Sequence, residues 1–352
     1  MAWIEPEFSK KAVSRAGDHL LDNSLSEEQH SEAMLILNNW RSSHAFPLTI
    51  VQTFLRAKAN KIDRHALIAQ RLKRVPSILG KLKRFPTMRL HRMQDIGGCR
   101  AVVADVKKVY KLRDDLVNSR TRHEFIKEND YINHPKESGY RGIHLIYKYR
   151  SSKTIIYNDH MIEIQIRTQL QHAWATTVEI VGTFLKESLK SSQGPEEWLH
   201  FFKLISVLFS DLEECSPKEI VVEEIENIRA EARKLADKLY VIEKLQAFSV
   251  STHHIGEQNK SSGYFLLSLR TDKRTIQVNH YNKRDLVVAT ELYLELEKEY
   301  ENNVNANVVL VAAASIKSLR VAYPNYFADS RVFLERLKDV LRLTDDAKSA
   351  YI

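Results

Sequence analysis

The segment from Ile162 to Arg167 alternates strictly between apolar and polar residues. On a β-strand, this alternation places three isoleucines on one face and Glu163, Gln165 and Arg167 on the other. The isoleucine face belongs in a hydrophobic core. The opposite face carries a carboxylate, an amide and a guanidinium, which favours a functional site; an edge strand facing water is the alternative. The chain therefore needs a sheet with one buried face and one polar face.

Further strands and helices are expected along the whole chain. The sequence predicts strands at 99–103, 142–149, 264–270, 275–281 and 308–314, and a hairpin made by 154–157 and 161–167. Helical spacing predicts helices over much of 1–60 and at 106–118, 168–189, 196–211, 221–248, 286–300 and 330–341. This order indicates an α+β fold. We divide it into an N-terminal helical region (1–60), a central domain (61–190), a helical connector (191–249) and a small, separable C-terminal α/β domain (250–352).

Charge and cysteine content narrow the classes of function. The stretch from Arg56 to Arg100 contains 13 lysines or arginines against two acidic residues, in a chain of net charge +8. Such a block favours a phosphate-facing surface and a polyanionic partner, with an ordinary basic protein as the alternative. Two cysteines are too few for a disulfide framework or a four-cysteine zinc site, so we expect no zinc and a reducing, cytoplasmic compartment. Without a signal-peptide pattern or an apolar run of roughly 20 residues, no membrane is expected.

Four residues inside this block are spaced for phosphate binding. Lys73, Ser77 and Lys81 follow one another at intervals of four, which places them on one face if the segment is a helix. Arg71 lies beside them. Because a triphosphate needs several cations at once, this set is a candidate ATP clamp. A generic basic surface helix would show the same spacing.

Asp95 stands just before the glycine pair Gly97-Gly98 and the first predicted strand. Mg²⁺ is usually held by one or two carboxylates together with substrate phosphates. Asp95 is therefore a candidate Mg²⁺ ligand, and an ordinary turn aspartate is the alternative.

A loop near residue 140 combines cations with an aromatic ring. Pro135 and Gly139 bracket it, and Lys136, Tyr140 and His144 lie in or directly after it. A tyrosine presented by such a loop can stack on a nucleobase. A tyrosine that only fills the core is the alternative.

Taken in series, these motifs resemble the synthetase domain of RelA/SpoT enzymes. The matching strings are Asp-Ile-x-Gly-x-Arg from Asp95, Pro-Lys-x-x-Gly-Tyr from Pro135 and Glu-Ile-Gln-Ile-Arg-Thr from Glu163, and the resemblance covers roughly residues 60–190. It implies a nucleotidyltransferase-like mixed sheet flanked by helices. It also implies transfer of the β,γ-pyrophosphate of ATP to a 3′-hydroxyl, with AMP leaving.

The resemblance also assigns roles to single residues. It implies that the ATP phosphates bind Arg71, Lys73, Ser77, Lys81 and Arg100. It implies that Asp95 holds Mg²⁺ and that Glu163 shares the metal or takes the proton of the attacking hydroxyl. The acceptor side would consist of Lys136, Tyr140, His144, Gln165 and Arg167.

The chain departs from the family pattern in ways that bear on its substrate. Long members carry a hydrolase domain with a His-Asp motif, and this chain has no His-Asp pair, so we expect no hydrolase activity. Asn129 stands where the family often has a lysine, which puts a nucleotide acceptor in doubt.

The C-terminal domain contains Tyr323-Pro-Asn-Tyr326 before the last predicted helix. It resembles the antitoxin-like domain of fused toxin–antitoxin synthetases of the CapRel type. That resemblance implies a regulatory role for Tyr323 and Tyr326, modification of the 3′ CCA end of tRNA, inhibition of translation and release by a phage protein. Ordinary packing around a proline turn is the alternative.

Three functions remain open from the sequence. The first is a self-restrained toxin that uses tRNA as acceptor. The second is an alarmone synthetase that makes guanosine tetra- or pentaphosphate from GDP or GTP. The third is a catalytically dead nucleic-acid-binding protein, which the presence of Asp95 and Glu163 disfavours.

Overall fold

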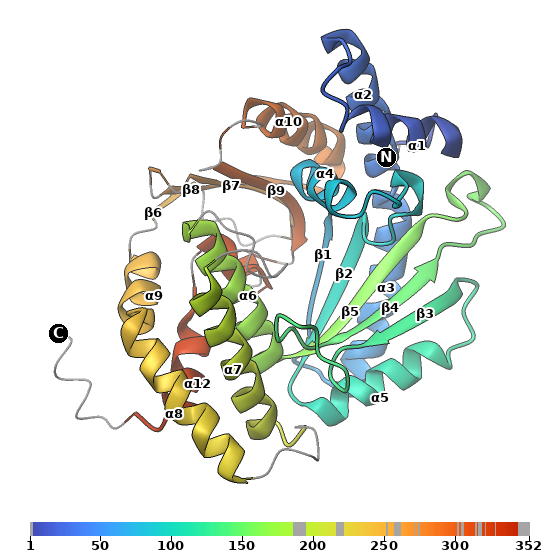
Figure 1. Ribbon diagram of the computed structural model, residues 1–352. Helices are drawn as coiled ribbons and strands as arrows, with labels where there is room; N and C mark the ends of the chain where they lie inside the picture. The colour runs from blue at the N-terminus through green and yellow to red at the C-terminus, as the bar shows by residue number, and fades with distance from the viewer. Residues whose placement is uncertain are drawn as a thin grey trace.

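A nine-stranded sheet runs through the part of the protein that the structure describes (Figure 1). The computed structural model describes residues 3–185, 195–215, 222–250, 253–256, 262–270, 272–273, 275–300, 303, 306–313, 315, 319–320, 322–327 and 329–343. The strand order is β3-β4-β5-β2-β1-β9-β7-β8-β6. The strands are β1 Leu67–Leu72, β2 Gly97–Val103, β3 Glu124–Asp130, β4 Ile143–Lys148, β5 Met161–Thr168, β6 His253–Gly256, β7 Gly263–Arg270, β8 Thr275–Tyr281 and β9 Ala306–Ala313.

The sheet is mixed, which confirms the expected α+β class. Strands β2 and β5 are parallel, whereas β1–β2, β3–β4 and β4–β5 are antiparallel pairs. The predicted hairpin of 154–157 with 161–167 is wrong. Residues Ile155–Tyr157 form a short 3₁₀ helix, and β5 takes β4 and β2 as its neighbours.

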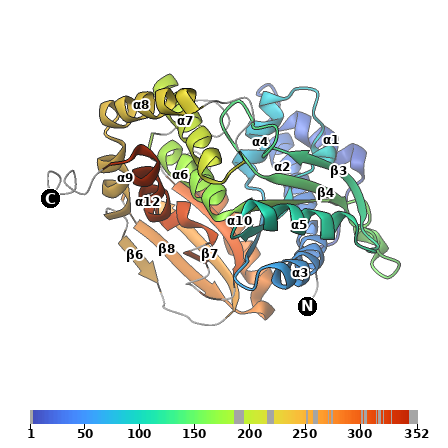
Figure 2. The same ribbon diagram turned by 90° about the horizontal axis from the view of Figure 1, so that it is seen from below.

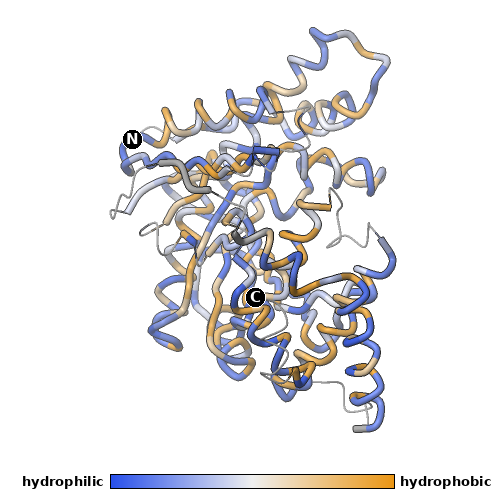
Figure 3. Tube along the Cα trace, turned by 90° about the vertical axis from the view of Figure 1, so that its left-hand side faces the viewer, coloured by the Kyte–Doolittle hydropathy of each residue, from blue (hydrophilic) through white to orange (hydrophobic). Residues whose placement is uncertain are grey.

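The helices follow most of the predicted ranges. They are α1 Lys10–His19, α2 Glu27–Ser43, α3 Ala45–Ile62, α4 Val75–Arg84, α5 Val106–Val117, α6 Gln169–Leu185, α7 Glu196–Leu212, α8 Val222–Lys238, α9 Val241–Val250, α10 Leu286–Glu299 and α12 Arg331–Leu341. The single helix predicted at 221–248 is wrong, because Tyr240 adopts a left-handed conformation (φ 51°) that separates α8 from α9. Hydropathy alternates along the helices in Figure 3, as expected for helices that bury one face.

Different helices cover the two faces of the central sheet. Helices α3 and α5 pack on one face, where Ile162, Ile164 and Ile166 are fully buried with Leu48 and Leu55. This confirms that the isoleucine side of β5 belongs to the core. Helix α6 leads from β5 onto the opposite face, which carries Glu163, Gln165 and Arg167 (Figures 1 and 2).

The C-terminal strands continue this sheet instead of forming a sheet of their own. Strand β9 pairs with β1 through two residue pairs, Gln70 with Ala312 and Arg71 with Val311. The expectation of a C-terminal module that is separable from the core therefore differs from the structure, in which backbone hydrogen bonds join the two. None of the helices in the described ranges has the length and apolar character that crossing a bilayer requires.

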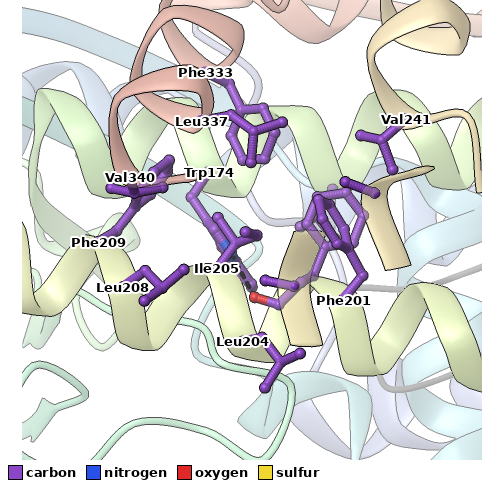
Figure 4. Close-up of a cluster of buried hydrophobic side chains, with 14 of the residues drawn as sticks. Trp174, Phe201, Leu204, Ile205, Leu208, Phe209, Val241, Phe333, Leu337 and Val340 are labelled. Carbon is purple, nitrogen blue, oxygen red and sulfur yellow. Dashed lines mark hydrogen bonds between the residues drawn. The ribbon is translucent and has the colours of Figure 1, made fainter. Parts of the chain in front are cut away.

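A helical cluster anchors the C-terminal helix α12 (Figure 4). Phe333 and Leu337 of α12 are fully buried against Trp174 of α6 and Phe209 of α7. Arg233 of α8 donates a hydrogen bond to the backbone oxygen of Leu341 at the end of α12. Both ends of the chain segment around Tyr323 are thus fixed, one by β9 and the other by α12.

We expect Phe333→Ala to lower the free energy of unfolding by about 3–5 kcal/mol, because it leaves a cavity in this cluster. Urea denaturation measures the change. Val332→Ala on the same helix is the matched control, since Val332 is 52% exposed, and its effect should stay within about 0.5 kcal/mol. Equal stability of the two variants would contradict the packing of α12.

Candidate active site

Asp95 lies between two lysines that the sequence placed in the ATP clamp. The Nζ atom of Lys73 is 3.0 Å from Oδ2 of Asp95, and the Nζ atom of Lys81 is 2.9 Å from Oδ1. The prediction that Lys73, Ser77 and Lys81 share one helix face is wrong. Arg71 ends up on strand β1, Lys73 lies in the loop after it, and only Ser77 and Lys81 belong to α4.

These ion pairs control the charge of Asp95. Burial acts to raise the pKa of its carboxyl group, and so does the charge of Glu163, but Lys73 and Lys81 outweigh them and the pKa is lowered. Asp95 is therefore ionised at neutral pH. Since Glu163 acts on the pKa of Asp95, and Lys73 acts on that of Glu163, both carboxylates belong to one electrostatic site.

Strand register explains why these groups meet. Gly98 on β2 pairs with Arg71 on β1 and with Glu163 on β5, so the three residues form one row across the sheet. A Cβ atom at Gly98 would have no neighbour closer than 4.0 Å. The floor of the site between Arg71 and Glu163 therefore carries no side chain, which leaves room for a ligand.

Glu163 and four other side chains form a closed ring of hydrogen bonds. Nδ1 of His144 donates to Glu163 (2.8 Å), Gln165 donates to the other carboxylate oxygen (2.6 Å), and Arg167 donates to Gln165 (2.7 Å). Arg167 also donates to the hydroxyl of Tyr140 (3.0 Å), which contacts Nε2 of His144. The ring fixes the orientation of Glu163.

The pKa values of the ring members define their protonation. Burial acts against the charge of Glu163, yet His144 and Gln165 hold its pKa below the usual range. Burial lowers the pKa of His144 despite the adjacent carboxylate, and burial raises the pKa of Tyr140 to about 12. His144 is then a neutral imidazole that donates through Nδ1 and accepts the hydroxyl hydrogen of Tyr140 at Nε2.

Tyr140 lies elsewhere than the sequence indicated. We expected its ring to be presented by a loop, but it is only 2% exposed. Lys136 and Arg167 lie against the ring, at 5.1 Å and 4.9 Å from its centroid. In this structure, base stacking on Tyr140 would require these two cations to move. Tyr131, which the sequence analysis did not single out, is the half-buried ring nearest to Lys136, at 4.4 Å.

Residues 322–327, which we call the plug, cover the remaining cations of the site. Arg100 donates a hydrogen bond to the backbone oxygen of Ala322, and its guanidinium lies 5.5 Å from the centroid of the Tyr323 ring. The hydroxyl of Tyr323 donates to the backbone oxygen of Gln70 (2.7 Å). Tyr323 and Tyr326 are 4% and 3% exposed.

Burial and neighbouring groups shift the pKa values of the two site arginines in opposite directions. Burial acts to lower the pKa of Arg71, but Glu179 of α6 and the two tyrosines of the plug raise it overall. Burial and the neighbouring Arg167 lower the pKa of Arg100 to about 10. Glu179 was not singled out from the sequence, because its helix was assigned no site residue.

The donor set fits a magnesium ion held jointly by the protein and a phosphate substrate. The described residues contain no cluster of three or more His, Cys, Asp or Glu side chains that could hold a metal by themselves. Asp95 already attracts two ammonium groups, so its position favours positive charge. Two carboxylates with the remaining ligands taken from phosphates and water is the usual arrangement for Mg²⁺.

Comparison with known proteins places the site within a described family region. Residues 70–181 match the model of the "Region found in RelA / SpoT proteins", so the chain contains a RelA/SpoT region. It is 37% identical over 112 residues to the GTP pyrophosphokinase YjbM of Bacillus subtilis, which is 31% of this chain and 52% of YjbM. It is 29% identical over 170 residues to the GTP pyrophosphokinase YwaC of the same organism, covering 43% of this chain and 79% of YwaC.

The chain thus spans about half the length of YjbM. Among solved structures, it is similar to the small alarmone synthetase 1 from Bacillus subtilis bound to its product pppGpp. The identity is 30%, the TM-score is 0.37, and the match covers 47% of this chain and 78% of that chain.

We expect Lys81→Met to raise the pKa of Asp95, because it removes one of the two charges that lower it. Carboxyl-carbon NMR titration of Asp95 measures the shift. The stabilising effect of the Lys81–Asp95 pair is present above the unfolded pKa of Asp95 and is lost as pH falls, so the variant should be less destabilised in acid. Lys83→Met, at an exposed position of the same helix, should leave the pKa of Asp95 unchanged.

Proposed function

Because residues 70–181 are a RelA/SpoT region, we propose that the chain is a pyrophosphokinase that transfers the β,γ-pyrophosphate of ATP to a 3′-hydroxyl. The observation that carries this proposal is the pair of lysines on Asp95, next to a hydrogen-bonded Glu163. Two carboxylates and several half-buried cations gathered beside one face of the sheet match the needs of a reaction between polyanions. They argue against a catalytically dead nucleic-acid-binding protein.

Asp95 would hold Mg²⁺, which neutralises phosphate charge in reactions of this kind, and Glu163 is left to take the proton. When ATP binds, the ammonium groups of Lys73 and Lys81 pair with its phosphates in place of Asp95. Arg71 and Arg100 contribute two more positive charges from the adjacent strands. Ser77 lies four residues before Lys81 on α4 and would add a hydroxyl donor for the ATP phosphates.

Glu163 is the base in this proposal. The 3′-oxygen of the acceptor forms a bond to the β-phosphorus, the bond between that phosphorus and the oxygen of AMP breaks, and Glu163 takes the hydroxyl proton. His144 and Gln165 keep the carboxylate ionised and oriented before the acceptor arrives. Lys136, Arg167 and Tyr140 would then line the acceptor side, with the Tyr140 ring available to a base only after Lys136 and Arg167 move.

We propose the 3′ CCA end of tRNA as the acceptor. The basic block leaves seven cations exposed, which suits an RNA backbone better than a mononucleotide: Arg56, Lys61, Arg64, Lys83, Arg84, Arg89 and Arg92. Asn129, which pairs with His144 across β3 and β4, supplies no charge to a nucleotide phosphate. GDP or GTP is the second candidate acceptor, because the relatives YjbM and YwaC bear the name GTP pyrophosphokinase.

We also propose that the plug restrains the enzyme. Arg100 donates a hydrogen bond to Ala322 and packs against the ring of Tyr323, so Arg100 cannot meet ATP phosphates fully while the plug is in place. Restraint by the same chain suits a toxin–antitoxin protein that blocks translation during phage infection. A phage protein acting on the C-terminal domain is the proposed trigger.

Incubation with γ-labelled ATP and either tRNA or GDP and GTP tests the reaction and its acceptor. We expect label in tRNA; label only in nucleotide would make the chain an alarmone synthetase. Asp95→Asn should lower transfer on the order of a hundredfold or more, while the protein stays folded, because it removes a charge that the transition state uses. Full activity of Asp95→Asn would contradict the role of this carboxylate.

Removal of the plug rings should release the enzyme. We expect Tyr323→Ala and Tyr326→Ala to raise the transfer rate of the full chain and to tighten ATP binding, because the plug then holds Arg100 less firmly. Labelled transfer and growth inhibition on expression measure the effect. Tyr240→Ala is the control, since Tyr240 is 62% exposed on the helical connector. Unchanged activity and toxicity in both plug variants would remove the plug from the mechanism.

A further inference from the structure

We infer that the C-terminal domain also supports the active site, through a positioning residue, Glu297 of α10. This inference rests on the proposed function. Its basis is a contact between chain segments 222 residues apart, in which the backbone N–H of Val75 donates to Oε1 of Glu297 at 2.9 Å. Val75 is the first residue of α4, the helix that carries Lys81.

The residue that precedes α4 cannot cap the N-terminus of this helix. That residue is Arg74, whose guanidinium has donors only and cannot accept a hydrogen bond from the first turn. Pro76 has no N–H group. The free N–H group of Val75 therefore needs an acceptor from elsewhere, and a carboxylate at a helix N-terminus is also favoured by the helix dipole.

Arg41 of α2 joins Glu297 to the loop that carries Lys73. Its Nε atom donates to the backbone oxygen of Lys73 (2.7 Å), and its Nη1 atom is 3.8 Å from Oε2 of Glu297. Its guanidinium also lies 4.6 Å from the ring centroid of Tyr293, whose hydroxyl donates to Glu297. The side chains of Arg41 and Glu297 are only 3% and 9% exposed, so water screens their attraction weakly.

Glu297 and the plug contact the residues of the active site from opposite faces of the sheet. Phe265 and Leu267 of β7 pack with Tyr323, whereas Leu266 between them packs with Tyr293 of α10. Because alternate residues of a strand face opposite sides, the plug and α10 lie on different faces. Figure 1 shows α10 beside α4, away from α6. Withdrawal of the plug therefore leaves the contact between Glu297 and Val75 in place.

The consequence is a C-terminal domain with two opposite effects. The plug lowers activity, and Glu297 raises it by holding Lys73 and Lys81 in position for the ATP phosphates. In the released background Tyr323→Ala, we expect E297A to raise the KM for ATP roughly two- to thirty-fold, as for loss of a helix cap, with a smaller change in kcat. E297Q keeps an oxygen acceptor for the N–H group of Val75. Its KM for ATP should therefore stay close to that of the Tyr323→Ala background.

Glu295→Ala is the matched control, because Glu295 is exposed on the same helix. Amide hydrogen exchange of residues 75–84 provides a readout that does not depend on catalysis. We expect faster exchange in E297A and normal exchange in E297Q and Glu295→Ala. If E297A matched Glu295→Ala in exchange and in KM, Glu297 would have no positioning role.

The two proposals fail in different ways. If no released variant transferred pyrophosphate to any acceptor, the proposed function would be wrong, and the exchange of α4 would still decide whether Glu297 holds this helix. If transfer occurred and KM for ATP were unchanged in E297A, the reaction would stand and the inference about Glu297 would fall.

Discussion

The pairing of β1 with β9 is the constraint on which the rest of the structure depends. It consists of two residue pairs, and it makes the C-terminal strands a continuation of the sheet that carries the site. Because side chains alternate along β1, its two faces make different contacts. Ala69 packs with the plug tyrosines, while Gln70 and Leu72 face a cavity lined by Tyr293 of α10. A register shift of one residue would exchange the two faces and remove both sets of contacts.

The plug holds Arg100 with weak partners. Arg100 receives a backbone carbonyl and the face of a tyrosine ring, neither of which carries a full negative charge. A phosphate oxygen is a stronger acceptor for a guanidinium than either of them. The opposite is true of Asp95, whose partners are two full charges. Restraint that uses neutral groups can therefore be reversed by a competing polyanion or by a partner that draws the plug away.

The sequence predicted the parts of the site that depend on short-range pattern. Alternation on β5 located Glu163, Gln165 and Arg167, and the burial of the isoleucines confirmed it. The spacing of Lys73 and Lys81 singled out two lysines that meet at Asp95, but they do not share a helix face, because β1 ends between Arg71 and Lys73 and only Lys81 is helical. Tyr140 is covered by Lys136 of its own loop and by Arg167 of β5, and its burial depends on how the loop folds onto that strand, which no local pattern encodes. Glu297 lies 222 residues from its partner, so only the fold reveals it.

As proposed, the C-terminal domain both restrains and supports the enzyme, so it cannot simply be removed to activate it. Loss of the plug would free Arg100, but loss of α10 would leave Val75 without its carboxylate acceptor and Arg41 without Glu297 and Tyr293. A buried guanidinium that loses its partners is unfavourable, so the loop that holds Lys73 would rearrange. The structure thus favours activation by a local movement of residues 322–327 against a sheet that stays paired. Such a movement needs no unfolding of the domain, and it can be reversed as soon as the tyrosines return.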